Sequence, residues 1–432
     1  MNKKLLIIFF ILLVLVVALS GWLFLGRTDS PKEILKNLPI VQQVLPSPIN
    51  QTPKSGKLVS STFERTFTKT AISSSNSSFY GSNSLPANYD VDKYNVIYES
   101  LDAENNTLQI HAQLFIPKAA TGQELPLYIF GQGTTGLGDH CAPSNEQPQI
   151  ENWGNYPAHM LSYASQGFIV MFPDYEGFND PTRIHHYFNA QLEAHVLLDG
   201  ARATYAFFNE ENLPVTPEQS VFFAGYSQGG HAAFAVSDIA GTYAPDVPTK
   251  GVMSYGGTTD IPNLLKENPA LSPYLVYAYS DYYGENRVNP SQILRPELLS
   301  NLEQTVTSTC IGKIYQAYSS SQGQIFNSQF LEALNGNTLE SDFPELAKVF
   351  TENSTGLKQN PIPALVLQGS TDPIVTVAST QEFLTKVCAL GNSVTYLEYP
   401  GVHHYQTRQV SFSDSITWMN QIRNGQTPQK YC

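Results

Sequence analysis

The pattern of hydrophobic and polar positions along the chain predicts both strands and helices. Residues 94–99 and 107–116 alternate apolar with polar side chains, which is typical of strands with one buried face. Short, almost continuous apolar runs, typical of strands buried on both faces of a parallel sheet, follow at 126–130, 168–172, 220–224, 251–255 and 364–367. Stripes of helical spacing lie between these runs at 191–208, 231–240 and 380–390. The alternation predicts an open, mostly parallel α/β sheet with helices on both faces.

The N-terminus has a different pattern. Lys3 and Lys4 precede an uncharged apolar run, Leu5–Leu25, which as a helix would span about 30 Å, enough to cross a bilayer. A secretory signal could be cleaved near Ala18 and Ser20, but the apolar run continues past that point, which favours an uncleaved anchor. Both alternatives predict that residues 1–29 contact the membrane and that the remainder is exported.

Residues 30–87 lack apolar periodicity. Pro31, Pro39, Pro46, Pro48 and Pro53 punctuate its first part and a serine-rich run follows at 73–78, so we expect a linker and surface loop. The composition of the whole chain, 42% hydrophobic and 14% charged, excludes global disorder. A net charge of −13 argues against a nucleic-acid-binding protein, because an acidic surface repels phosphates.

The strongest chemical motif follows the run 220–224. Gly225–Gly229 reads Gly-Tyr-Ser-Gln-Gly and stands between that predicted strand and the next helix. This is the setting of a nucleophile elbow, a sharp turn whose glycines leave room for an exposed serine in the α/β-hydrolase fold. The motif predicts Ser227 as the nucleophile and the backbone N–H of Gln228 as one donor to an oxyanion.

A serine nucleophile needs a histidine base that is oriented by a carboxylate, and in this fold the chain order is serine, acid, histidine. Asp372 follows the predicted strand 364–367 and precedes Pro373, so it fits the place of the acid. A turn or cap aspartate is the structural alternative. Asp174 and Asp260 are rivals, because each also follows a predicted strand. The first precedes the serine and breaks the order, whereas the second follows the strand directly after the elbow.

The base is expected in the last loop before the terminal helix. His403 and His404 follow the predicted strand 393–399 there, and two adjacent side chains cannot both point into one site with the same geometry. His404, the third residue after Gly401, is the expected base, with His403 as the alternative.

Other histidines raise the question of a metal site. His185, His186 and His195 could combine with Asp174 and Asp180. However, the chain has no H-E-x-x-H motif and no Cys/His pair at zinc spacing. We therefore expect hydrogen-bonded loop packing for His185 and His186, and neither a metal nor a cofactor.

A glycine-rich loop, Gly131–Gly136, follows the run 126–130. In α/β-hydrolases the loop at this place supplies the second oxyanion donor. A phosphate-binding loop is the alternative, but the Walker lysine and the spacing at a helix start are missing.

At this point the chain resembles the secretory lipase family, which includes fungal lipase A-type enzymes. The resemblance extends from about residue 95 to the C-terminus and is carried by several short motifs taken together. These are Gly133–Gly136, Cys141–Ser144, Pro173–Gly177, Asp199 with Arg202 and Ala203, Gly225–Gly230, Gly369 with Asp372, His404, and Trp418–Cys432.

The resemblance implies an α/β-hydrolase with a helical cap that acts on acyl esters. It implies that Ser227, Asp372 and His404 form a catalytic triad and that the backbone amides of Thr134 and Gln228 bind the oxyanion. The chain departs from many relatives in one place relevant to this loop, because it has Gln132 where they have histidine. Asp199 and Arg202, three residues apart on a predicted helix, are expected to form a structural ion pair.

Four cysteines alone allow three pairings. Export makes disulfides plausible, and the absence of a C-x-x-C motif argues against a redox role. The resemblance to the family implies the pairs Cys141–Cys310 and Cys388–Cys432.

The stretch between Ser227 and Asp372 is longer than the strand and helix units between them require. The surplus, residues 261–357, is expected to form a cap over the carboxyl edge of the sheet. Its tyrosine-rich part, 273–283, either lines an apolar acyl site or packs the cap onto the core. The expected division of the chain is an N-terminal signal or anchor, a linker, and a hydrolase core interrupted by the cap, at residues 1–29, 30–87, 88–260, 261–357 and 358–432.

Together these features predict an exported serine hydrolase that cleaves carboxylic esters, lipid acyl esters above all, through an acyl-enzyme. A serine peptidase or acyltransferase is the alternative within enzymes, because amides and esters react by the same chemistry. A non-catalytic binding protein on a hydrolase scaffold is the alternative from another class, and the complete set of serine, acid and histidine argues against it.

Overall fold

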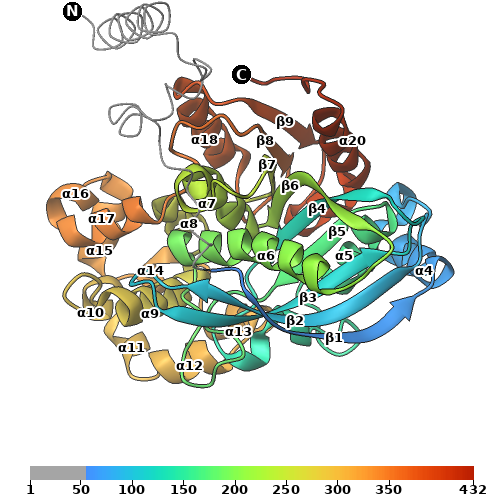
Figure 1. Cartoon of the computed structure of the whole chain (residues 1–432). Helices are drawn as coiled ribbons and strands as arrows, with labels where there is room; N and C mark the ends of the chain where they lie inside the picture. The colour runs from blue at the N-terminus through green and yellow to red at the C-terminus, as the bar shows by residue number, and fades with distance from the viewer. Residues whose placement is uncertain (1–54) are drawn as a thin grey trace, which may run out of the picture. The chain divides into compact units, whose positions relative to one another are not determined.

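The computed structural model describes residues 55–432, which form a nine-stranded sheet with helices on both faces (Figure 1). The expected signal or anchor at 1–29 and the first part of the expected linker lie outside these residues. Within residues 55–432, no helix has the length and apolar character needed to cross a membrane.

The sheet has the strand order β1-β2-β3-β5-β4-β6-β7-β8-β9. The pairs among β1, β2, β3 and β5 are antiparallel, whereas all neighbours from β5 across to β9 are parallel. The mostly parallel α/β sheet is thereby confirmed. The strands are β1 Leu58–Phe67, β2 Val91–Leu101, β3 Thr107–Pro117, β4 Glu124–Gly131, β5 Ile169–Pro173, β6 Thr216–Tyr226, β7 Thr249–Tyr255, β8 Ala364–Gly369 and β9 Val394–Tyr399.

The central strands are buried on both faces, as their continuous apolar runs predict. In β4, Leu127 and Ile129 pack into one hydrophobic core, and Tyr128 and Phe130 pack into the other, because successive side chains of a strand point to opposite faces. The helices over the first core are α6 Ala190–Glu210, α7 Gln228–Tyr243 and α18 Val377–Ala389. The helices over the second core are α4 Lys69–Tyr80, α5 Tyr156–Ser165 and α20 Phe412–Arg423.

Two regular elements, β1 and α4, lie inside the range 30–87 that the sequence predicts as linker and surface loop. β1 is held mainly by its backbone pairing with β2, and most of its side chains are exposed or half-buried, so it has no apolar signature. In α4, Thr68 caps the first turn by accepting from the Ala71 N–H, and Ile72 and Phe79 are buried against the second core. Because α4 has few apolar side chains and many serines, its sequence does not show the apolar stripe that predicts a helix.

Ten helices, α8 to α17, lie between β7 and β8 and gather at the lower left of Figure 1. Their apolar residues form a third core together with Leu137, Tyr187 and Phe188. Their bounds are α8 Ile261–Glu267, α9 Ser272–Tyr283, α10 Pro290–Ile293, α11 Pro296–Leu299, α12 Leu302–Ser308, α13 Ile311–Ala317, α14 Gln322–Ile325, α15 Ser328–Gly336, α16 Leu339–Asp342 and α17 Pro344–Glu352.

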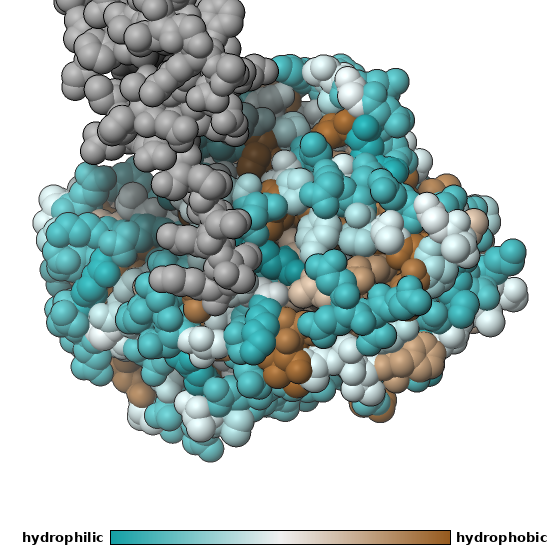
Figure 2. Space-filling model, in the orientation of Figure 1, coloured by the Kyte–Doolittle hydropathy of each residue, from teal (hydrophilic) through white to brown (hydrophobic). Residues whose placement is uncertain are grey.

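The four cysteines form the two disulfides that the family resemblance implies, Cys141–Cys310 and Cys388–Cys432. The first joins the loop after β4 to the residue that precedes α13, and the second ties the C-terminus to α18. The face of the molecule in Figure 2 is mostly hydrophilic, with hydrophobic residues in small separate groups. Many apolar side chains are buried in the three cores.

Candidate active site

Ser227 occupies the tight turn between β6 and α7. Its backbone has φ 55° and ψ −114°, a conformation that few residues other than glycine adopt. The flanking glycines are needed because the ends of the elements touch. A Cβ on Gly225 would lie 2.0 Å from the Gly229 carbonyl oxygen, and a Cβ on Gly229 would lie 2.0 Å from the Gly131 carbonyl oxygen. The sequence motif is therefore explained by the close contact of β4, β6 and α7.

The two expected oxyanion donors flank the serine. Gln228 is the first residue of α7, and the first N–H groups of a helix have no acceptor within the helix. Thr134 lines the same cavity as Ser227, and its hydroxyl is 2.7 Å from the Tyr187 hydroxyl. The loop that carries it is held by Tyr156, whose hydroxyl oxygen accepts from the Gly133 N–H at 2.8 Å.

Gln132, the departure from many relatives, is fully buried. Its side-chain amide has no hydrogen-bond partner among residues 55–432, whereas its backbone carbonyl accepts from the Tyr175 hydroxyl at 3.3 Å. The backbone of the loop is thus anchored without the side chain.

The structure brings Asp372 and His404 together. His404 Nδ1 lies 2.8 Å from Asp372 Oδ2, and both side chains are almost fully buried. The other carboxylate oxygen accepts from the N–H groups of Ile374 and Val375 at 2.8 and 2.9 Å, which fixes its orientation. Because Nδ1 donates to the carboxylate, Nε2 is the ring nitrogen that can accept a proton. Gly256 belongs to this arrangement, since a Cβ there would lie 3.1 Å from both Asp372 Oδ2 and His404 Nδ1.

The alternative base, His403, is oriented differently. It is exposed, and its Nδ1 lies 2.9 Å from the Thr371 carbonyl oxygen. His403 borders the cavity but does not pair with Asp372 in the way that His404 does.

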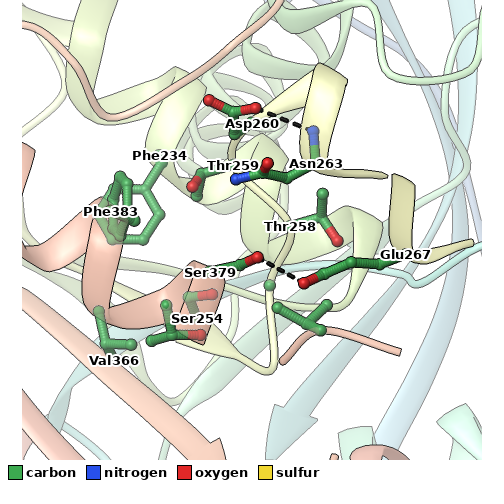
Figure 3. Close-up of a pocket in the computed structure, with 13 residues that line it drawn as sticks. Phe234, Ser254, Thr258, Thr259, Asp260, Asn263, Glu267, Val366, Ser379 and Phe383 are labelled. Carbon is green, nitrogen blue, oxygen red and sulfur yellow. Dashed lines mark hydrogen bonds between the residues drawn. The ribbon is translucent and has the colours of Figure 1, made fainter. Parts of the chain in front are cut away.

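The rival carboxylates have other partners. Asp260 caps α8 by accepting from the Asn263 N–H at 3.0 Å, and it forms an ion pair with Lys386 at 3.4 Å. It borders a separate cavity of about 20 Å³ between α8 and α18, in which Glu267 accepts from Ser379 (Figure 3). Asp174 accepts from the Ser144 N–H at 2.8 Å and from its hydroxyl. Both rivals therefore have structural roles.

Ser227, His404 and Thr134 border one cavity of about 490 Å³. The rest of its wall is mainly apolar and aromatic and includes Trp153, Tyr226, Leu271, Ile311, Tyr315, Pro373, Ile374, His403 and Tyr405. Ile311 and Tyr315 come from α13, so the α8–α17 segment supplies part of the wall. This wall can accommodate the uncharged part of a substrate.

The tyrosines expected at 273–283 pack instead of lining this cavity. Tyr274 and Tyr279 are buried in the third core, and their hydroxyls donate to the carbonyls of Thr309 and Phe188. Tyr282 and Tyr283 border a different cavity. The packing alternative therefore holds for this segment.

Three histidines that could have been metal ligands, His185, His186 and His195, take part in packing contacts, as the sequence predicts for the first two. His185 stacks on Tyr175, and burial lowers its pKa to about 3. Burial opposes the charge of His186 as well, but hydrogen bonds to Asp281 and Glu176 outweigh it and raise the pKa of His186 to about 9. His195 Nδ1 donates to the carbonyl of Leu101 and its ring stacks on Tyr243, whereas Asp199 and Arg202 form the expected ion pair at 2.9 Å.

Two features of this region have no counterpart in the sequence motifs. One is Tyr156, which holds the glycine-rich loop. The other is a buried pair below the elbow, in which His231 Nδ1 lies 2.6 Å from Glu193 Oε2. A glutamate and a histidine on the buried faces of two predicted helices would have been the only available signal.

The fold and the elbow define the class: the protein is an α/β-hydrolase. The family model described as secretory lipase matches residues 158–430, and the chain belongs to this family. It is therefore a carboxylic ester hydrolase.

Two curated relatives are named as a lipase and an esterase, and one solved structure shares the fold. Lipase A of Moesziomyces aphidis is 24% identical over 359 residues, covering 78% of this chain and 73% of that protein. The trichothecene C-3 esterase of Fusarium sporotrichioides is 22% identical over 366 residues, covering 77% of this chain and 75% of that protein. The crystal structure of Candida antarctica lipase A in its closed state has a similar fold, with a TM-score of 0.65 at 18% identity over 90% of this chain and 89% of that one.

Proposed function

We propose that the protein is an exported serine esterase that cleaves lipid acyl esters, with Ser227, His404 and Asp372 as its triad. The observation that carries the proposal is the shared cavity. Ser227 and His404 border the same space, and His404 Nδ1 lies 2.8 Å from Asp372 Oδ2.

The first half of the reaction uses these groups in order. As Ser227 Oγ bonds to the ester carbonyl carbon, His404 Nε2 takes its proton and the carbonyl electron pair moves to the oxygen. The resulting oxyanion accepts from the backbone N–H groups of Thr134 and Gln228. His404 then gives the proton to the ester oxygen, the C–O bond breaks, and the alcohol leaves an acyl group on Ser227.

The second half regenerates the enzyme. A water molecule gives a proton to His404 as its oxygen bonds to the acyl carbon, and the oxyanion uses the same two N–H groups. Collapse of this intermediate releases the acid and returns the proton to Ser227. Asp372 holds the imidazole in the required tautomer and stabilises its charged form while the proton is on the ring.

Export is supported by three observations. The N-terminal lysines and the apolar run Leu5–Leu25 have the composition of a signal or anchor. The family is described as secretory. The four cysteines form two disulfides, which are typical of exported proteins. Fractionation of cells that make the full chain tests this: the protein should be found outside the reducing compartment, with both disulfides intact.

Substrate class is tested by matched panels. Hydrolysis of p-nitrophenyl esters from acetate to palmitate and of emulsified triacylglycerols should be compared with hydrolysis of the corresponding anilides. We expect ester hydrolysis with far higher kcat/KM than amide hydrolysis. Comparable rates on amides, or activity confined to the shortest acyl groups, would contradict the lipid esterase proposal.

A further inference from the structure

Below the nucleophile elbow lies a second carboxylate–histidine pair that the proposed reaction does not use. Glu193 is on α6 and His231 is on α7, and the two helices pack side by side (Figure 1). Glu193 is 1% exposed and His231 is fully buried, with 2.6 Å between Glu193 Oε2 and His231 Nδ1. Such a pair is kept only where its remaining polar atoms also find partners.

The other oxygen of Glu193 reaches the elbow itself. Gln228 Nε2 donates to Glu193 Oε1 at 2.7 Å and lies 2.7 Å from His185 Nε2. His185 Nδ1 donates to the Glu176 carbonyl at 3.1 Å, so its Nε2 is the unprotonated nitrogen and accepts from Gln228. The low pKa of His185 agrees with this neutral form. Both N–H groups of the Gln228 side chain are therefore held by acceptors.

The far end of the network is fixed to the segment that follows α17. His231 Nε2 lies 2.6 Å from the Asn353 carbonyl oxygen, and the side-chain amide of Asn353 donates to the Tyr283 hydroxyl at 2.8 Å. The His231 carbonyl in turn accepts from the Thr355 hydroxyl at 3.1 Å. The pair is thus braced on both sides and cannot shift without breaking several buried hydrogen bonds.

We propose that Glu193 is a positioning residue for ester hydrolysis, acting through the Gln228 side chain on the backbone N–H that binds the oxyanion. The inference rests on the proposed function. An oxyanion donor acts only if it lies about 2.7–3.1 Å from the developing charge. At the first position of a helix this N–H is not held by the helical ladder. The side-chain anchor supplies the missing constraint.

Glu193 contacts the network through both of its carboxylate oxygens. Glu193 Oε1 accepts from Gln228, and Oε2 accepts from His231. In Glu193→Met both acceptors are removed while the length of the side chain is kept, so both contacts are lost. We expect kcat to fall at least about tenfold with KM within about twofold, the pattern of a lost transition-state interaction.

Inactivation by a fluorophosphonate gives a second measurement of the same effect. The phosphoryl oxygen of this probe develops negative charge in the oxyanion site, so its inactivation rate should fall by the same factor as kcat. An unchanged inactivation rate, or a change confined to KM, would overturn the inference.

Asp199→Leu is the matched control, because it likewise removes two carboxylate acceptors. Asp199 is on the same helix, is fully buried and is also bonded through both oxygens, but its partners are Ser55, Ser100, Tyr243 and Arg202, away from the elbow. This variant should lose thermal stability and keep kcat within about twofold of the wild type. If it loses kcat as strongly as Glu193→Met, then general loosening of α6 explains both and the inference fails.

A double-mutant cycle tests the route through Gln228. Gln228→Met removes the amide and should itself lower kcat, even if Glu193→Met does not fold. If Glu193 acts through this side chain, the double variant should be no slower than Gln228→Met alone. The inference would be overturned if the loss of kcat in the double variant equals the product of the two single losses, or if Gln228→Met keeps the wild-type kcat. Activity of Ser227→Ala would instead sink the proposed function, so the two failures are distinguishable.

Discussion

Two carboxylate–histidine pairs lie within the same small region of this molecule, and they differ mainly in what the second ring nitrogen faces. In both, the Nδ1 atom of the histidine bonds to the carboxylate, at 2.8 Å for His404 with Asp372 and at 2.6 Å for His231 with Glu193. His404 borders the cavity beside Ser227, whereas His231 Nε2 is bonded to the Asn353 carbonyl oxygen.

The comparison shows that residue types and pair geometry are not sufficient for proton transfer. A general base must reach the group from which it takes a proton. Both nitrogens of His231 are engaged by oxygen atoms at 2.6 Å, so neither is open to a nucleophile or a substrate. His404 comes from a loop at the edge of the sheet, where one nitrogen can remain accessible. The packing position of each histidine therefore determines whether it serves chemistry or structure.

The largest effect is expected from Ser227→Ala, which removes the group that the His404 pair serves and the His231 pair does not. Ester hydrolysis and fluorophosphonate labelling should both be abolished. The serine side chain borders a cavity, so the circular dichroism spectrum and the unfolding midpoint should stay close to the wild type. Near wild-type activity in this variant would remove the basis for the mechanism.

Next comes the comparison of the two neighbouring histidines. His404→Ala should lower kcat at least about a thousandfold, because a triad member carries several powers of ten in rate. His403→Ala should lower it far less, since His403 is exposed and its Nδ1 is bonded to the Thr371 carbonyl. Steady-state kinetics on one soluble ester decides the order, and the reverse order would reassign the base.

Asp372→Asn should also slow turnover, by about a thousandfold or more. Two N–H groups donate to Asp372 Oδ1, so the asparagine would keep its oxygen there and turn its NH₂ toward His404 Nδ1. The imidazole would then hold its proton on the wrong nitrogen. Asp260→Asn, which alters a helix cap, serves as the control and should retain most of the wild-type kcat.

His231→Ala tests the structural pair by stability. Removing the histidine leaves the Glu193 carboxylate buried without its charged partner, and such losses are worth about 3–5 kcal/mol. We expect the free energy of unfolding, measured in urea, to fall by about that amount. The loss of kcat should be much smaller than for His404→Ala, because Gln228 still has Glu193 as a partner. A larger loss of activity than in His404→Ala would contradict the comparison.

The smallest effect is expected for the pH dependence of stability at a third histidine, His186, which contacts two carboxylates, Glu176 and Asp281. The pKa of His186 in the folded protein is about 9, above its ordinary value of 6.5, so its contribution to stability is complete below pH 6.5. The contribution is lost as the pH rises through 9, because the folded state must then release its proton. The midpoint temperature of thermal unfolding should therefore fall more steeply across this pH range for the wild type than for His186→Gln. Parallel curves would contradict the prediction.

Much of the fold and of the site geometry is predictable from the sequence, because its signals are local. The apolar runs identify the buried strands, and the glycines around Ser227 report a turn that only small residues allow. The spacing of Asp372 and His404 after their strands places both at one edge of the sheet, where the structure joins them. Their catalytic roles remain predictions for the experiments above.

The rest depends on contacts between distant segments. The sequence predicts a loop where β1 and α4 lie, because neither element has an apolar pattern. The strand is held by backbone pairing, and the helix buries few of its side chains. The roles of Glu193 and Gln228 depend on a contact across 35 positions in the chain, which no single-sequence pattern reports. Tyr156 likewise acts on Gly133 only after α5 packs behind the loop.

The Cys141–Cys310 bond has a mechanical consequence for substrate access. The α8–α17 segment is continuous with the sheet at its two chain ends, and a body joined at two points can still swing about the line between them. The disulfide adds a third attachment next to α13, where the Ile311 N–H also donates to the Thr135 carbonyl at 2.8 Å. Three attachments remove that swing. At the rim of the cavity, Tyr315 and Tyr405 are 43% and 61% exposed, so rotation of these side chains would widen the entrance without moving the segment.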